Sequence, residues 1–407
     1  MLGLVLSVGP PLLLFSIVFI WKNPTHWRKY IWMFVLLLML LANSFVPTPN
    51  ADLSRYYSAV EKAGTHSFIE AVFGTKNGLY DGLYIINAVF WIVAKTGCKG
   101  LLPALSVAVV YGVAFYVTCD CAERYEKTDW IRWLLTIQFL LLPFYNIINN
   151  IRNVIAFALV VLAMYRELIQ NKKNVVTYLL YLIPCFIHAF ALTAILIRIL
   201  SGVIKKARII GILLVAAGSS AIELLYSNIG TFSAIPIVYN IIAKAHHYLS
   251  PEYGETEWAI RVTTEIFYQA GFYANIFFGI GLVFFLAMTL KHLQDSRCLK
   301  KNESIIVNWE FWVGILIISC IPFSAPYYWR YATLATICIG VIFVITDAPN
   351  TRIWTFAKWI FWGAAIAVAG LQFYELFLRA VRTDWLIMFM LNNPYVILVT
   401  IVKNIIT

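Results

Sequence analysis

The chain has 407 residues, of which 61% are hydrophobic and only 13% are charged, and its mean hydropathy is +0.79. Soluble domains usually carry about a quarter charged residues, so this composition excludes an ordinary soluble protein. The net charge of +11 does not indicate nucleic-acid binding, because the Lys and Arg are scattered in short segments between apolar runs. Runs of roughly 16–22 apolar residues recur throughout, each long enough to cross a bilayer. We predict an all-α polytopic membrane protein, with residues 1–407 forming one domain.

Basic segments along the chain predict its topology. A group of Lys and Arg between residues 22 and 29 follows the first apolar run, 2–21, which we interpret as a retained helix because no cationic segment precedes it. This group predicts an inner connection, so the next helix, 31–46, is expected to run outward. Residues 47–80 are then expected to form an outer loop rich in polar and aromatic residues.

The next stretch has one apolar segment too many for a simple count of crossings. Four segments precede the basic residues at 166–173: 82–96, 101–118, 133–148 and 150–166. Four full crossings from an outer start would end outside, whereas the basic residues require an inner end. Either 133–148, which contains Pro143, is re-entrant, or 80–96 lies along the membrane surface. Both alternatives place Arg152 at the outer surface.

Residues 174–203 have basic residues of the inner type at both ends, which a single crossing does not allow. A re-entrant pair of short helices that breaks near 184–188 returns the chain to the side from which it started. Non-helical backbone is tolerated at membrane depth where protein or water surrounds it. We therefore predict a hairpin rather than one crossing.

The remaining segments bring the expected total to about 11–13 transmembrane or re-entrant helices. Helices 209–227 and 271–290 leave residues 228–270 outside as the longest loop. Four further helices are expected, at 305–323, 332–346, 353–376 and 385–402. Residues 324–333 are expected to form a short outer turn, with Pro and aromatic residues that are typical of a membrane interface.

Ionisable groups near membrane helices are costly, so each one on the outer side is a candidate functional residue. Asp52 and Arg55 would share one face of a helix, where a local ion pair explains them as well as substrate binding does. Arg152 has a simple explanation too, since a helix-end Arg often reaches for lipid head groups. The Asn residues around it, in the sequence YNIINNIRN, instead favour a polar cavity.

Further candidates follow later in the chain. His188 is either a core residue or, at the tip of the hairpin, a proton-transfer group, since the ordinary pKa of His is about 6.5. Arg330 stands among aromatic residues that a membrane interface explains, but the interface does not explain the Arg. The 228–270 loop contributes His247 and Arg261. No His, Cys and carboxylate spacing predicts a metal ligand set, so we expect no metal.

Together these residues suit a lipid-linked sugar. The planar guanidinium of Arg pairs bidentately with the oxygens of a diphosphate. Aromatic faces suit the C–H surfaces of sugar rings. A long isoprenoid tail would lie between helices with its head group at the outer interface. The residues therefore favour an extracytoplasmic enzyme that acts on lipid-linked sugars.

The order of short motifs resembles one protein family. The motifs are Asp-x-x-Arg-Tyr at Asp52, Arg55 and Tyr56, Ile-Arg-x-x-x-Ala at 151–156, Phe-x-His ending at His188, and Arg-Tyr at Arg330 and Tyr331. Over most of the chain, this order resembles the EpsG-like branch of the Wzy-type polysaccharide polymerases. The chain departs from that pattern at Asn153, where the family often has Gln, and after His188, where the family often has a small residue.

The resemblance implies a GT-C-like architecture with long outer loops. It also implies an enzyme that polymerises oligosaccharide repeat units carried on undecaprenyl diphosphate, for O-antigen, capsule or exopolysaccharide. The reaction would take place at the outer face of the bacterial cytoplasmic membrane, without a cofactor. The implied partners are the lipid-linked oligosaccharide, the bilayer, a chain-length regulator and a flippase, and no nucleic acid.

The resemblance also implies roles for the residues. Arg152 and Arg330, with Arg55, would bind the diphosphate, and Asp52 or His188 would activate the acceptor hydroxyl. Contacts to the sugar are expected from Tyr56, Tyr331, Arg261 and His247. An O-antigen ligase or another polyprenyl-linked glycosyltransferase would use the same outer chemistry. A lipid-linked oligosaccharide flippase is the alternative from another class.

Overall fold

The computed structural model describes residues 27–47, 49, 51–74, 80, 82–142, 144–188, 191–192, 194–195, 198–199, 224–232, 238–239, 242–243, 246, 325–346, 355–356, 359, 363 and 367. Every regular element among them is helical, which confirms the all-α prediction for this part of the chain. The predicted helices 2–21, 271–290, 305–323 and 385–402 lie outside the described residues, as do most of 209–227, 353–376 and the 228–270 loop.

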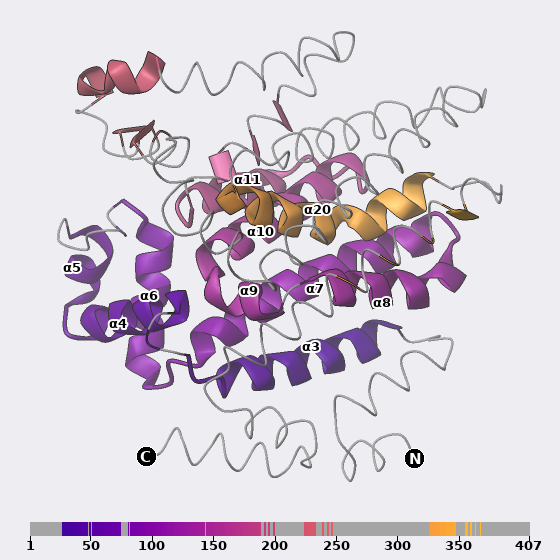
Figure 1. Cartoon of the computed structure of the whole chain (residues 1–407), viewed down its shortest axis with the longest axis horizontal. Helices are drawn as coiled ribbons and strands as arrows, with labels where there is room; N and C mark the ends of the chain where they lie inside the picture. The colour runs from indigo at the N-terminus through magenta and orange to yellow at the C-terminus, as the bar shows by residue number, and fades with distance from the viewer. Residues whose placement is uncertain are drawn as a thin grey trace.

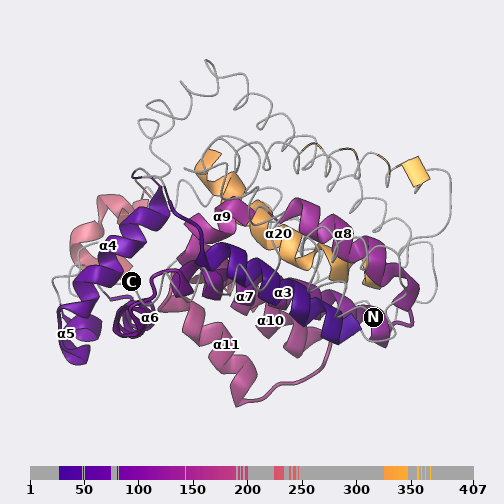
Figure 2. The ribbon, with the colours of Figure 1, turned by 90° about the horizontal axis from the view of Figure 1, so that it is seen from below.

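The central helix of the bundle is α7 (Leu101–Arg124), which packs against α3 (Trp27–Asn43), α8 (Ile131–Leu141), α10 (Ile151–Leu168) and α20 (Ala325–Thr346). Figures 1 and 2 show these helices lying side by side around α7. Almost the whole of α7 is apolar and buried. Among the described residues, it is the one helix with the length and apolar composition needed to cross a membrane.

The short helices α8 and α9 (Phe144–Asn149) together run antiparallel to α7. Polar side chains of α7 bond to them in reverse order: Thr118 to the Gln138 side chain (3.0 Å), Tyr111 to the Leu142 carbonyl (2.9 Å) and Ser106 to the Ile147 carbonyl (2.7 Å). These contacts follow α7 over about 18 Å of its length. Of the two alternatives, the structure disfavours a re-entrant 133–148, because this segment continues along α7 instead of turning back.

The segment between α3 and α7 begins and ends at one end of the bundle. Cys98 Sγ donates to Asn43 Oδ1 (3.4 Å), and Gly100 lies so close to the Asn43 carbonyl oxygen that a Cβ would not fit between them. We call this end the outer end, following the charge-based topology, and the end near Arg124 and Arg166 the inner end.

Three helices between α3 and α7 form a separate cluster at the outer end (Figure 1). They are α4 (Asp52–Gly64), α5 (Phe68–Phe73) and α6 (Tyr84–Thr96). The α6 side chains Trp91 and Lys95 donate to the carbonyls of His66 and Gly64, both at 3.2 Å. Since α6 packs on this cluster rather than along α7, the structure favours the alternative in which 80–96 lies along the surface.

A buried carboxylate joins α7 to α10 at the inner end. Asp120 Oδ2 accepts hydrogen bonds from the Tyr165 hydroxyl (2.6 Å), Arg124 Nε (2.6 Å) and Gln170 Nε2 (3.1 Å). These donors compensate for the desolvation of the carboxylate. They also explain why α7 continues to Arg124, beyond the predicted end at residue 118.

The hairpin predicted in 174–203 is confirmed where the structure describes it. Helix α11 (Val175–Cys185) starts at the inner end, where Arg166 Nε donates to Thr177 Oγ1 (3.2 Å). The chain then returns, because Arg198 Nη2 donates to Glu167 Oε1 at 2.8 Å. Between these points, the ring of Phe186 lies 6.2 Å from the ring of Tyr84, at the start of α6. The reversal therefore lies at the outer end.

Helix α20 runs from the outer to the inner end. Gln138 Nε2 donates to the carbonyls of Thr336 (3.2 Å) and Ile337 (2.9 Å), and Gly340 packs against Thr118. The expected turn at 324–333 is wrong, since the helix already begins at Ala325. Pro326 stands in its first turn, where a missing N–H breaks no helical bond.

The position of α6 predicts the side of the membrane from which single introduced cysteines react, in a variant that lacks the native cysteines. His66→Cys and Lys99→Cys flank α6, and both should react with an impermeant maleimide from the same side of the membrane. Asp129→Cys, beyond the inner end of α7, should react only from the opposite side. Labelling of the two flanking positions from opposite sides would show that α6 crosses.

Candidate anion-binding site

Arg152 lies in the first turn of α10, at the outer end of the bundle. No side chain caps this helix, and no acidic residue stands in its first turn. The N-terminus of a helix carries a partial positive charge, so a cation there is unfavourable unless an anion balances it. The sequence thus places the positive charge of Arg152 beside the partial positive charge of the α10 N-terminus.

The aromatic rings of Tyr56 and Tyr80 hold the guanidinium of Arg152. Arg152 Nε lies 3.4 Å from the Tyr56 hydroxyl oxygen, to which it donates. The guanidinium carbon lies 5.7 Å from the ring centre of Tyr56 and 4.8 Å from that of Tyr80. Among the described residues, no carboxylate lies within ion-pair distance of Arg152. Most of the five N–H donors of this partly buried cation therefore remain for a ligand.

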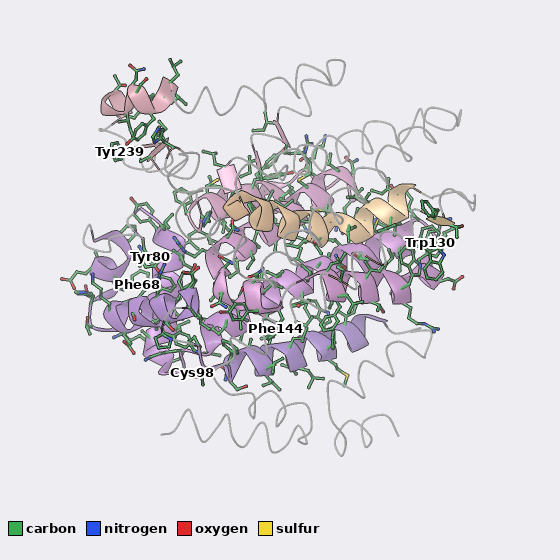
Figure 3. The ribbon with its side chains drawn as sticks, in the orientation of Figure 1. Phe68, Tyr80, Cys98, Trp130, Phe144 and Tyr239 are labelled. Atoms are coloured by element: carbon green, nitrogen blue, oxygen red, sulfur yellow. The ribbon has the colours of Figure 1, made fainter. Side chains whose placement is uncertain are left out.

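Tyr80 does not supply the missing negative charge. Burial raises the pKa of its hydroxyl to about 12, although the neighbouring Arg152 acts to lower it. The side chain therefore stays neutral at physiological pH and contributes its ring face alone. Figure 3 shows Tyr80 near the α4–α6 cluster, on the same side of the molecule as Phe68 and Cys98.

Asp52 and Arg55 lie beside this site as an ion pair. Asp52 begins α4, and its Oδ1 accepts from Arg55 Nη1 at 3.2 Å. Both side chains are exposed, at 48% and 70%. Asp52 precedes Tyr56, the residue that contacts Arg152, by about one turn of α4. Tyr56, the third residue of the predicted motif, is the one that contacts Arg152.

A buried hydrogen bond connects α4 to the end of α9, two residues before α10 begins. The backbone N–H of Leu53 donates to Asn149 Oδ1 at 3.3 Å, and Asn149 Nδ2 donates to the Tyr145 carbonyl at 3.1 Å. Asn149 is therefore a structural residue that places the motif helix against Arg152. Of the four Asn residues around Arg152, Asn149 therefore has a structural role that requires no ligand.

Register along the bundle places Arg330 at the level of Arg152. Arg152 precedes Tyr165, the partner of Asp120, by about 20 Å of helix. Arg330 precedes Gly340, the neighbour of Thr118, by about 15 Å. Because Thr118 lies about 3 Å outward of Asp120 in α7, the two Arg backbones fall within one helical turn of each other in height. The structure describes the backbone of Arg330 and Tyr331, but not their side chains.

His188 also lies at the outer end. Its backbone N–H donates to the Pro184 carbonyl at 2.9 Å, just after α11, and the ring of Phe186 contacts Tyr84. The side chain of His188 is partly buried. The structure thus gathers Asp52, Tyr56, Arg152 and the hairpin tip at one end of the bundle. His247 and Arg261 lie outside the described residues.

Sequence reasoning missed Tyr80. Its position in an aromatic outer loop gave no signal of a specific contact, because the ring reaches Arg152 only through the packing of α4 and α6. Within the described residues, no group of three His, Cys, Asp or Glu is arranged to hold a metal ion.

Compared with models of known protein families, with curated protein sequences and with solved structures, the chain shows no match to any of them.

The unbalanced charge at Arg152 predicts binding of a small anion. Inorganic pyrophosphate should raise the Tm of the purified protein, because a ligand that binds only the folded state stabilises it. Arg152→Gln should abolish this rise. It should change the free energy of unfolding of the free protein by no more than about 1 kcal/mol. The substitution loses the cation–π contacts, but it also removes the unfavourable interaction between a positive charge and the N-terminus of α10. Thermal unfolding with and without pyrophosphate measures both effects, and an equal rise in both proteins would contradict the site.

The ring of Tyr80 should matter more than its hydroxyl. Tyr80→Phe keeps the face that lies against Arg152 and should retain pyrophosphate binding within about twofold. Tyr80→Leu removes a contact of about 0.5–2 kcal/mol and should weaken binding by roughly three- to thirtyfold. Titration calorimetry compares the two variants. A larger loss in the Phe variant than in the Leu variant would point to the hydroxyl instead.

Proposed function

We propose that this chain polymerises oligosaccharide repeat units carried on undecaprenyl diphosphate, by glycosyl transfer at the outer face of the bacterial cytoplasmic membrane. One observation carries the proposal: a partly buried guanidinium at an uncapped helix N-terminus, held by two neutral rings and paired with no described carboxylate. Such a site fits a diphosphate better than a neutral ligand. The order of the sequence motifs, which resembles that of polysaccharide polymerases, supports a sugar as the group attached to this diphosphate.

The chemistry follows from the charge that develops in the reaction. A hydroxyl of one repeat unit attacks C1 of the sugar at the reducing end of the growing chain, and the bond from C1 to the diphosphate oxygen breaks. The diphosphate leaves with increased negative charge, which Arg152 and the N-terminus of α10 stabilise. The backbone of Arg330, in α20, lies at about the same height along the bundle as that of Arg152. The proton of the attacking hydroxyl goes to Asp52 or His188, the two candidate bases at this end.

Apolar surfaces support placement in a bilayer. On α3, Trp32 and Leu36 are more than half exposed, and on α11 the same is true of Val175, Tyr178 and Leu182. Exposed apolar side chains along the sides of helices are expected where lipid surrounds them. With α7 long enough to span, these surfaces fit a polytopic protein of GT-C-like architecture. The bilayer and the lipid-linked oligosaccharide are then its partners.

The inner end favours an enzyme over a flippase. A flippase needs a cation-lined path that opens to both sides, whereas the described inner end of α10 is joined to α7 by Asp120 and to the hairpin by Glu167. An O-antigen ligase remains the nearest rival, because it would use the same diphosphate site. The pattern of surface glycan separates the two enzymes.

Arg152→Ala should stop polymerisation while the protein still inserts into the membrane. Loss of one preorganised donor costs about 3–4 kcal/mol in comparable sites, or a factor of roughly 10²–10³ in rate. Gel electrophoresis of surface glycan should show single repeat units in place of a ladder, with the amount of protein followed by immunoblot. A ladder of normal length would contradict the role of Arg152, and complete loss of attached glycan would indicate a ligase.

The matched control is Arg166→Ala, which removes a cation from the inner end of the same helix and should leave the ladder intact. The purified protein should also extend lipid-linked repeat units in the presence of a chelator, as expected for catalysis by Arg and a general base. Loss of activity with the chelator and recovery with a divalent metal would contradict that mechanism.

A further inference from the structure

Asn153, next to Arg152, is an unusual buried residue. Its side chain is 4% exposed, and neither Oδ1 nor Nδ2 has a hydrogen-bond partner among the residues that the structure describes. Six other buried polar side chains of the described bundle are bonded: Ser106, Thr118, Asp120, Gln138, Asn149 and Thr177. Gln170 leaves Oε1 without a hydrogen bond, but its Nε2 donates to Asp120. Among the described residues, Asn153 is thus the one buried amide with neither side-chain atom bonded, and it lies in the turn that carries Arg152.

This amide lowers the stability of the fold. A buried polar group without a partner loses its hydrogen bonds to water and gains nothing in return. An apolar residue of similar size would avoid this loss, so packing alone does not explain an Asn at this position. Groups that weaken a fold in this way concentrate where a ligand completes them.

We propose that Asn153 binds the sugar attached to the diphosphate, through a hydroxyl or acetamido group of that sugar. An Asn side chain offers one acceptor and two donors, and a hydroxyl or acetamido group offers a donor and an acceptor in return. A diphosphate offers acceptors only, so it would leave Oδ1 unpaired. This inference rests on the proposed function and adds a sugar subsite to it.

The geometry permits such a contact. Arg152 and Asn153 are consecutive in the first turn of α10 and lie about 100° apart around the helix, so a ligand that contacts both must extend from the guanidinium around this turn. No hydrogen bond within the described residues holds the Asn153 amide, so a ligand group that reaches it would find both amide atoms available. Asn149, four residues earlier, has both of its amide atoms bonded and is the natural control.

The test compares two lipids with purified full-length protein in detergent. One is undecaprenyl diphosphate, and the other is the lipid-linked repeat unit that accumulates in cells lacking this chain. In Asn153→Leu, affinity for the glycosylated lipid should fall roughly tenfold or more, while affinity for undecaprenyl diphosphate stays within twofold. The Tm should stay equal or rise. Asn149→Leu should instead lower the Tm, because it breaks two existing bonds.

Each other outcome overturns the proposal. Unchanged affinity for both lipids would mean that the amide faces buried water only. An equal fall for both would place Asn153 on the diphosphate, and a lower Tm in Asn153→Leu would show that the amide already has a structural partner. If the wild-type protein binds neither lipid, the proposed function fails and the sugar subsite fails with it.

Discussion

The bundle depends on a few polar contacts within an otherwise apolar core. Apolar side chains pack in many registers at similar energy, whereas a buried hydroxyl, amide or carboxylate must meet its partner at one height. In α7, Thr118 fixes the height of α8, and Asp120 fixes that of α10. Gln138 then extends this register to the carbonyls of α20, at Thr336 and Ile337. Through these bonds, α7 sets the positions of α8 and α10 directly and that of α20, which is distant in sequence, through Gln138.

The register determines where Arg152 and the backbone of Arg330 lie. Contacts near the inner end fix α10 and α20 relative to α7, and the lengths of the two helices then bring Arg152 and Arg330 to one level at the outer end. Tyr56 and Tyr80 complete the placement of Arg152 from a different part of the chain. The rings stabilise the cation without neutralising it, and so its capacity to attract an anion is kept. A carboxylate in either position would have stabilised the fold further and blocked the site.

Hydropathy and charge were enough to predict the helical class and the chain reversal that follows α11, because each depends on local composition. They could not decide whether α6 or the α8–α9 segment crosses, since both are short and apolar, and the answer depends on the contact of Cys98 with Asn43. The sequence does not predict the early start of α20, because a Pro such as Pro326 suits a turn as well as the first turn of a helix. The contact of Tyr80 with Arg152 joins positions 72 residues apart in sequence, and no local pattern encodes it.

The two ends of α10 differ in a way that separates stability from function. At the inner end, Tyr165 and Glu167 meet partners of matching chemistry, as an element that holds the fold together should. At the outer end the helix has no cap, Arg152 has no described counter-charge, and the amide of Asn153 has no partner. Each of these features costs stability, and an apolar or acidic residue would remove each one. Their concentration in a single helical turn, at the end of α10 opposite Tyr165 and Glu167, is what a ligand-binding site requires: the inner bonds keep the turn in place, and the ligand supplies what the turn lacks.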